Sequence, residues 1–276
     1  MLEKNLRTLG TLHDKNFANE MMEGEEMLVL PSIANVKRIA YTIYEWDDLM
    51  DSSNMTMEDW SHIARDIGEV YNWYDGFVVL HGTDTLCYTA SALSFMLQNL
   101  GKTVVVTGSQ IPCFETRSDG RDNIISALIF AGNYTIPEVC VYFDNKLMRG
   151  NRTVKCSAGS LHAFNSPNIT PLAMAMIDIK VEHQNIIKPA TMKKFQVVDT
   201  MCKDVAMLRI YPSIMASTVR HFLKLPIRGV VLQCYGAGKY FITIIIYYGG
   251  NYYDDICRQH SFQQTGHTGG HQRGSW

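Results

Sequence analysis

The sequence lacks the long apolar segments that a membrane protein needs. Its longest apolar run, Tyr240 to Tyr248, is far shorter than the roughly 20 residues that span a bilayer. The N-terminal residues, MLEKNLRTLG, contain no apolar signal region. These absences predict a protein with no membrane partner.

Paired cysteines and an excess of one charge are also missing. The seven cysteines include no Cys-x-x-Cys pair and their number is odd, which argues against a disulfide framework and predicts reduced thiols in the cytoplasm. Charged residues make up 19% of the 276 residues and the formal net charge is −2, so the composition does not favour nucleic acid as a partner. Chemistry on a small molecule fits this composition better.

Several motifs for metals, phosphates and nucleophiles are absent or incomplete. The sequence has no GxSxG elbow and no HExxH pair. Residues 236–239 resemble the end of a phosphate-binding loop, but the glycine that begins the motif and the hydroxyl residue that ends it are missing. His260, His267 and His271 have no cysteine or carboxylate partner at regular spacing. We therefore predict no metal site.

An alternation of strand and helix patterns is what the sequence does contain. Strands are predicted at 36–44, 76–80, 102–108 and 138–143, and helices at 55–74, 85–100 and 120–132, the last with Asp119 as its N-cap. This order predicts right-handed βαβ units and a parallel sheet with helices on both faces, an α/β fold. Ligands in such sheets bind where the C-terminal ends of the strands meet the next loops, here residues 81–84 and 108–118.

Changes in composition predict the domain organisation. A three-layer α/β domain is expected at 1–180, a polar linker with a proline at 181–197, and a truncated second α/β domain at 198–238. Residues 239–276 diverge, and their polar, glycine-rich end predicts disorder. The second domain is expected to contain a strand at 205–212, a helix at 213–225 and a strand at 228–236.

The most specific chemical feature is His81-Gly82-Thr83-Asp84-Thr85, which lies between a buried strand and a helix. Backbone N–H groups at the N-terminus of a helix stabilise negative charge on a ligand or an oxyanion. A hydroxyl followed by a carboxylate at this point could attack and orient a polar substrate. From the spacing alone, the alternative is that Thr83 and Asp84 only cap the helix.

Two further segments carry candidate functional groups. Lys155 ends the run 151–155 and becomes a general base if its surroundings favour the neutral amine; otherwise it is a solvated surface lysine. Asp51, Ser52 and Ser53 form a run of short polar residues before a helix. Their side chains could hydrogen-bond a small ligand, or they could serve as an N-cap cluster.

Read together, these segments resemble the L-asparaginase family, in particular its bacterial cytoplasmic type I enzymes and their animal relatives. The combination of HGTDT with RGNRTVK (149–155) is specific, and the resemblance extends over about residues 1–238. The other matching segments are MDSSNMTMEDW (50–60), GFVVLHGTDTL (76–86), VVVTGSQIP (104–112), SDGRDN (118–123), FNSPNITPLA (164–173), VAMLRIYP (205–212) and RGVVLQCYGAG (228–238).

The resemblance implies a cytoplasmic homo-oligomeric hydrolase that converts L-asparagine to L-aspartate and ammonia through a threonine nucleophile, with no metal or cofactor. It implies that Lys155 is the base for the Thr83 hydroxyl and that Asp84 binds the α-amino group of the substrate. The run Asp51–Ser53 is expected to bind the α-carboxylate end. A site that pairs both charged ends of an amino acid rejects analogues that lack either end.

The sequence also departs from the family pattern. The family has a Thr-Gly-Gly-Thr loop after its first strand, whose first threonine is generally assigned as the nucleophile, and neither that loop nor the mobile tyrosine loop after it occurs here. We therefore expect impaired activity and marginal stability. One alternative is a non-catalytic homologue that binds an amino acid or a partner subunit. Another is the amidase subunit of tRNA-dependent amidation, which would need an extra N-terminal domain and a partner subunit.

Overall fold

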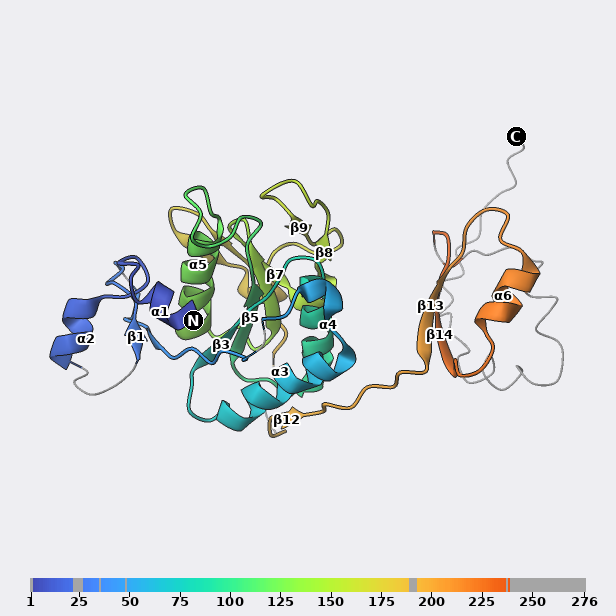
Figure 1. The fold of residues 1–276 in the computed structure, drawn as a ribbon, viewed down its shortest axis with the longest axis horizontal. Helices are drawn as coiled ribbons and strands as arrows, with labels where there is room; N and C mark the ends of the chain where they lie inside the picture. The colour runs from blue at the N-terminus through green and yellow to red at the C-terminus, as the bar shows by residue number, and fades with distance from the viewer. Residues whose placement is uncertain are drawn as a thin grey trace. The chain divides into compact units, whose positions relative to one another are not determined.

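The computed structural model describes residues 2–21, 27–34, 36–47, 49–188, 193–236 and 238. The chain divides into two compact units, residues 1–200 and 201–276, whose helices and strands are labelled in Figure 1. The divergent segment expected at 239–276 lies outside the described residues, and the expected domain boundaries stay a prediction.

A six-stranded sheet in the order β11-β10-β7-β6-β5-β3 forms the centre of the first unit. Three of the predicted apolar runs form its parallel part, and three shorter strands continue the sheet with antiparallel pairing. The parallel strands are β3 (Gly76–Leu80), β5 (Thr103–Thr107) and β6 (Val139–Phe143), and the antiparallel ones are β7 (Lys146–Arg149), β10 (Ala173–Ala175) and β11 (Ile179–Val181).

The α/β class predicted from the sequence is confirmed, but the sheet is mixed beyond β6. The chain turns back there through Asp144 and Asn145, which have φ angles of 50° and 61°. Two consecutive residues with positive φ form the tight turn that joins antiparallel strands, and Asp and Asn tolerate this conformation better than most residues. The turn therefore pairs β7 with β6 at once, without a crossover helix.

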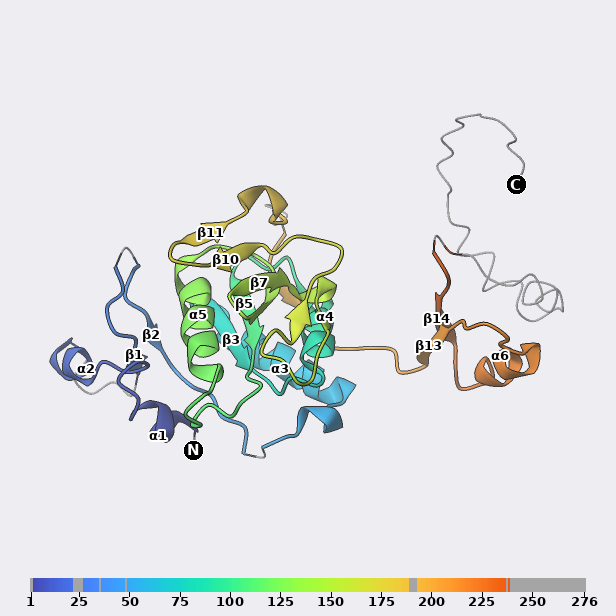
Figure 2. The same cartoon turned by 90° about the horizontal axis from the view of Figure 1, so that it is seen from above.

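Helices cover both faces of this sheet (Figure 2). The side chains of β5 alternate between the faces: Val104 and Val106 join one apolar cluster, whereas Val105 joins the other. The first cluster contains α3 (Met57–Val70) and α4 (Leu86–Met96), and the second contains α5 (Gly120–Asn133). All three predicted helices are confirmed, and the three-layer arrangement follows from the two apolar faces of the sheet.

Long-range pairing changes two of the predicted elements. The helix predicted at 85–100 ends at Met96, because β4 (Leu97–Gln98) pairs with β12 (Gln196–Val197). The strand predicted at 36–44 is paired only at β2 (Ala40–Tyr41), against β1 (Leu28–Val29). β12 belongs to the expected linker 181–197, and the ring of its neighbour Phe195 stacks on Tyr71 with 3.6 Å between centroids. The end of this segment is therefore packed within the first unit.

The first unit is completed by short elements: α1 (Leu2–Leu6), α2 (Lys15–Met21), the 3-10 turns η1 (Ser52–Asn54), η2 (Gly150–Arg152) and η3 (His183–Asn185), and the antiparallel pair β8 (Val154–Lys155) and β9 (Phe164–Asn165). In the second unit, β13 (Val205–Arg209) pairs in parallel with β14 (Gly229–Gln233), and α6 (Ala216–Phe222) connects them. The predicted strand–helix–strand pattern is confirmed there.

None of the helices in the described part of the chain has the length and apolar character needed to cross a bilayer.

Candidate active site

The predicted residues at the end of β3 lie where the parallel strands finish and α4 begins. The N-cap position of α4 is Thr85, and it makes no side-chain capping hydrogen bond. Its hydroxyl instead donates to the backbone carbonyl of Ser52 at 2.6 Å. The capping alternative for Thr83 and Asp84 is therefore wrong, because the side chains of both residues contact a lysine from a distant part of the sequence.

That lysine is Lys155, whose amine joins the hydroxyl and the carboxylate. Its Nζ lies 2.9 Å from Thr83 Oγ1 and 2.7 Å from Asp84 Oδ1, although more than 70 residues separate it from both. The Lys155 side chain is 18% exposed and the Asp84 side chain 64% exposed. The alternative of a solvated surface lysine is therefore wrong, and the carboxylate of Asp84 stays open to a ligand.

The backbone on either side of Lys155 is also held against α4 and β9. Lys155 pairs with Phe164 in the antiparallel β8–β9 ladder. Cys87, on the first turn of α4, lies close to this backbone, and burial raises the pKa of its thiol to about 11. Cys87 is thus a neutral thiol at physiological pH and does not compete with Thr83 as a nucleophile.

The polar run Asp51–Ser53 lies beside the same turn. Ser52 is buried, and a Cβ added to Gly82 would lie only 2.6 Å from Ser52 Oγ, so glycine is needed for the two segments to approach this closely. The Asp51 carboxylate accepts a hydrogen bond from the backbone N–H of Ser53 at 2.9 Å, and this bond lowers the Asp51 pKa. Asp51 thus caps the 3-10 turn η1, whereas the N-cap of the following helix α3 is Thr56, so the run does not cap that helix. The serines remain next to the Thr83 turn.

His81 is a supporting residue for which the motif alone predicts no separate role. Burial lowers its pKa, so the imidazole is neutral near pH 7. Its Nδ1 lies 2.7 Å from the Gly82 carbonyl and its Nε2 lies 2.7 Å from Thr89 Oγ1. Because a carbonyl can only accept, Nδ1 carries the proton and Nε2 accepts from the threonine. His81 thereby fixes the peptide that precedes Thr83, and its place in the HGTDT motif was the available signal.

The second predicted loop, 108–118, is organised by Asp119. This residue occupies the N-cap position of α5, as predicted, but its side chain makes no capping hydrogen bond to the helix. Its carboxylate instead accepts the backbone N–H groups of Gln110 and Ile111 at 3.0 to 3.1 Å. The bonded N–H groups lie eight and nine residues before Asp119, whereas an N-cap side chain bonds residues two or three positions after it. The bonds hold the start of the loop.

No group of three or more histidine, cysteine or acidic side chains in the described part of the chain is arranged to hold a metal ion. His260, His267 and His271 lie outside the described residues. The cluster of Thr83, Asp84 and Lys155 brings together a hydroxyl, a carboxylate and an amine.

Comparison with known proteins identifies the family of the region that contains this cluster. The family described as "Asparaginase, N-terminal" matches residues 7–187. The chain is 51% identical over 237 residues to the L-asparaginase of Dirofilaria immitis, covering 85% of the chain and 40% of the relative. It is 47% identical over 234 residues to the 60 kDa lysophospholipase of Mus musculus, covering 85% of the chain and 42% of the relative.

A solved structure agrees with the sequence relatives. The crystal structure of L-asparaginase I from Vibrio cholerae matches with a TM-score of 0.69 and 47% sequence identity, covering 73% of this chain and 61% of that one. The chain thus spans about two fifths of the length of the two curated relatives and about three fifths of this structure. The matched family region contains all six predicted site residues, and the chain belongs to the asparaginase family.

Proposed function

We propose that the chain is an amidohydrolase that converts L-asparagine to L-aspartate and ammonia at Thr83, Asp84 and Lys155. The observation that carries the proposal is the convergence of the Lys155 amine on the Thr83 hydroxyl and the Asp84 carboxylate. The names of the Dirofilaria and Vibrio relatives support asparagine as the substrate. The reaction uses protein groups alone in this proposal.

The chemistry starts with proton transfer. A neutral Lys155 amine accepts the Thr83 proton, and the hydroxyl oxygen attacks the side-chain amide carbon of asparagine. The C–N bond breaks, ammonia leaves with the transferred proton, and Thr83 holds the acyl group as an ester. Water then hydrolyses this ester, which releases aspartate and restores the hydroxyl.

Recognition of the substrate uses the charged groups around Thr83. Asp84 supplies a negative charge for the α-ammonium group. Of the run Asp51–Ser53, the serine hydroxyls can donate to the α-carboxylate, whereas Asp51 is ionised and holds the Ser53 N–H, so its part is to shape the turn. Both charged ends of the amino acid would then have partners of the opposite polarity.

Three further features belong to the proposal. Turnover by these 276 residues is low. They contain no Thr-Gly-Gly-Thr sequence, so the threonine that the family resemblance assigns as nucleophile is missing beside Thr83. The chain works in the cytoplasm, which agrees with the six described cysteines forming no disulfide with one another. It assembles with further copies of itself, which agrees with the exposed aromatic side chains Tyr88 and Phe95 on a helix without charged residues.

Replacing Thr83 by valine tests the reaction. Valine has nearly the same shape but no hydroxyl, so we expect ammonia release from L-asparagine to fall by at least about 100-fold, as for loss of a group that takes part in proton transfer. The measurement is coupled detection of ammonia over hours at high protein concentration. Thr83→Ser keeps the hydroxyl and is the matched control, which should retain a large part of the rate. A T83V rate equal to that of the unaltered chain would remove Thr83 from the mechanism.

Replacing Asp84 by asparagine tests recognition of the α-ammonium group. Loss of one charged hydrogen bond at a half-open site should raise the Kd for L-aspartate about 10-fold, which calorimetry measures directly. Succinate is the control ligand, because it lacks the amino group and should bind the D84N variant as well as the unaltered chain. Aspartate that binds both proteins equally would contradict this role. Tight aspartate binding without any turnover would favour the non-catalytic homologue.

A further inference from the structure

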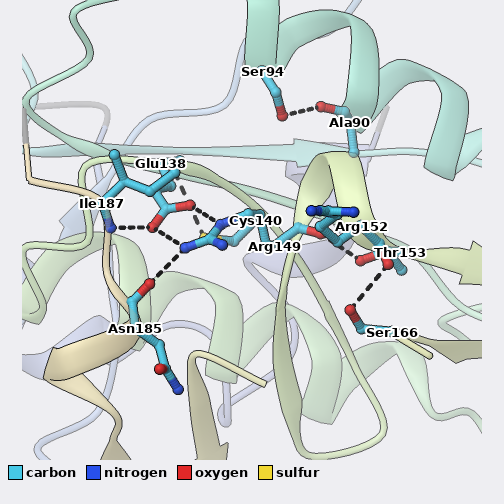
Figure 3. A network of polar contacts seen from close by, with 10 residues as sticks. All are labelled: Ala90, Ser94, Glu138, Cys140, Arg149, Arg152, Thr153, Ser166, Asn185 and Ile187. Carbon is cyan, nitrogen blue, oxygen red and sulfur yellow. Dashed lines mark hydrogen bonds and ion pairs between the residues drawn. The ribbon is translucent and has the colours of Figure 1, made fainter. Parts of the chain in front are cut away.

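The segment Arg149–Lys155 connects the sheet to the proposed active site. Figure 3 shows the polar contacts of Arg149, Arg152 and Thr153 in its first part. The segment leaves the sheet at the end of β7, makes one 3-10 turn and reaches Lys155 in β8. Its start, its turn and its end are each fixed by different partners. The position of the lysine amine therefore depends on this short connection.

The start of the segment is fixed by a buried ion pair. The Arg149 guanidinium donates two hydrogen bonds to the Glu138 carboxylate and one to the Asn185 carbonyl at 2.6 Å. The same carboxylate accepts the backbone N–H of Ile187 at 2.7 Å. Only 12% of the Arg149 side chain and 6% of the Glu138 side chain are exposed. The residue that begins the segment is thus held by three hydrogen bonds from its guanidinium.

The turn itself is closed by Thr153. Its buried hydroxyl donates to the Arg149 carbonyl at 2.8 Å, and its backbone N–H faces the Gly150 carbonyl at 3.4 Å. From outside the turn, Ser166 Oγ donates to the Arg152 carbonyl at 3.0 Å. Of these contacts, the bond from the Thr153 hydroxyl joins the turn directly to Arg149 at the start of the segment.

The far end of the segment is where a small displacement matters. Only Val154 separates Thr153 from Lys155, so a movement of the turn shifts the backbone that carries the lysine. The Nζ to Thr83 Oγ1 distance is 2.9 Å, and an increase of roughly 0.6 Å takes it beyond the range of a hydrogen bond. Proton transfer needs the base within this range of the group it deprotonates.

We propose that Thr153 is a positioning residue for Lys155: its hydroxyl closes the turn that begins at Arg149 and so sets the distance from the lysine amine to Thr83. Its importance for catalysis rests on the proposed function, whereas its effect on the lysine does not. The substitution that tests it is Thr153→Val, which removes the hydroxyl and keeps the shape. Thr153→Ser restores the hydroxyl on a smaller side chain.

The first readout is the reactivity of the Lys155 amine towards acetic anhydride, followed peptide by peptide with mass spectrometry. An amine released from its two acceptors reacts faster, and we expect a rise of about fivefold in T153V, the equivalent of one lost hydrogen bond. T153S should stay near the unaltered rate. The internal reference is Lys146, which lies beside Asp144 in the β6–β7 hairpin.

The matched control for a loss of stability alone is Thr103→Val. Thr103 is also buried, donates its hydroxyl to the Tyr134 carbonyl and accepts the Ile136 N–H, but it lies at the beginning of β5 and far along the chain from Lys155. T103V should lower thermal stability and leave Lys155 reactivity unchanged. The proposal would be overturned if the rate at which Lys155 reacts with acetic anhydride were unaltered in T153V. It would also be overturned if that rate rose equally in T103V. If T153V does not fold, Thr153→Ala, which also removes the hydroxyl, carries the test, and an unaltered Lys155 rate there overturns the proposal too.

The second readout separates position from binding. In T153V we expect kcat for ammonia release to fall about tenfold while KM changes by less than about twofold, with T153S restoring kcat. Loss of fold would lower the amount of active protein without this rescue. If Lys155 reactivity responds as expected but even the unaltered chain releases no ammonia, the proposed function fails and the positioning of the lysine stands.

Discussion

Replacing Arg149 by methionine is expected to lower the free energy of unfolding of the first unit by about 3–5 kcal/mol, the range for breaking a buried ion pair from one side. The Glu138 side chain is only 6% exposed. In the variant its carboxylate loses the guanidinium and keeps the hydrogen bond from the Ile187 N–H. A buried carboxylate without its counter-charge is costly because the interior solvates it poorly. Urea unfolding followed by tryptophan fluorescence measures the loss, since Trp46, Trp60 and Trp73 all belong to this unit.

The control is Arg65→Met, which breaks an ion pair with Asp199 on the surface. Its two side chains are 51% and 34% exposed, so the change should cost less than about 1 kcal/mol. Replacing Arg149 and Glu138 together by apolar residues should recover part of the loss, because no unpaired charge remains. Equal costs for R149M and R65M would show that burial does not strengthen the inner pair.

The central part of the fold could be predicted because its elements are long and regular. Strands β3, β5 and β6 are uninterrupted apolar runs that fit a sheet covered on both faces, and α3 shows apolar residues at helical spacing. The antiparallel strands β7, β10 and β11 contain three or four residues each, too few for a periodic pattern. The end of α4 at Met96 depends on pairing with a segment about 100 residues later, which no local pattern records.

The part of the candidate site that lies in short sequence motifs could be predicted. Two separate motifs indicate Thr83, Asp84 and Lys155, and in the structure the Lys155 amine lies within hydrogen-bonding distance of the other two. Their chemical roles stay a prediction. The part played by Asp119 could not be predicted, because its partners are backbone N–H groups of a preceding loop. The Glu138–Arg149 pair depends on the register of β6 against β7, which places Cys140 opposite Arg149.

Replacing Lys155 by methionine should have a large effect on activity and little effect on stability. The change removes the one amine that contacts both Thr83 and Asp84, so we expect ammonia release to fall by at least about 100-fold, the usual contribution of a positioned base. The Asp84 side chain is 64% exposed and stays solvated without its partner, so the cost in unfolding free energy should be at most about 1 kcal/mol. Methionine also preserves the apolar stem of the lysine, which limits the packing change.

The matched control is Lys146→Met, because Lys146 also pairs with an aspartate, Asp144, at the end of a central strand but does not belong to the Thr83 cluster. K146M should release ammonia at the unaltered rate. A base is needed only for the reaction, whereas Asp84 accounts for recognition of the α-ammonium group, so K155M should still bind L-aspartate in calorimetry. An active K155M variant would require a different base for the Thr83 hydroxyl, and loss of aspartate binding in K155M would show that the lysine orders the site rather than reacting in it.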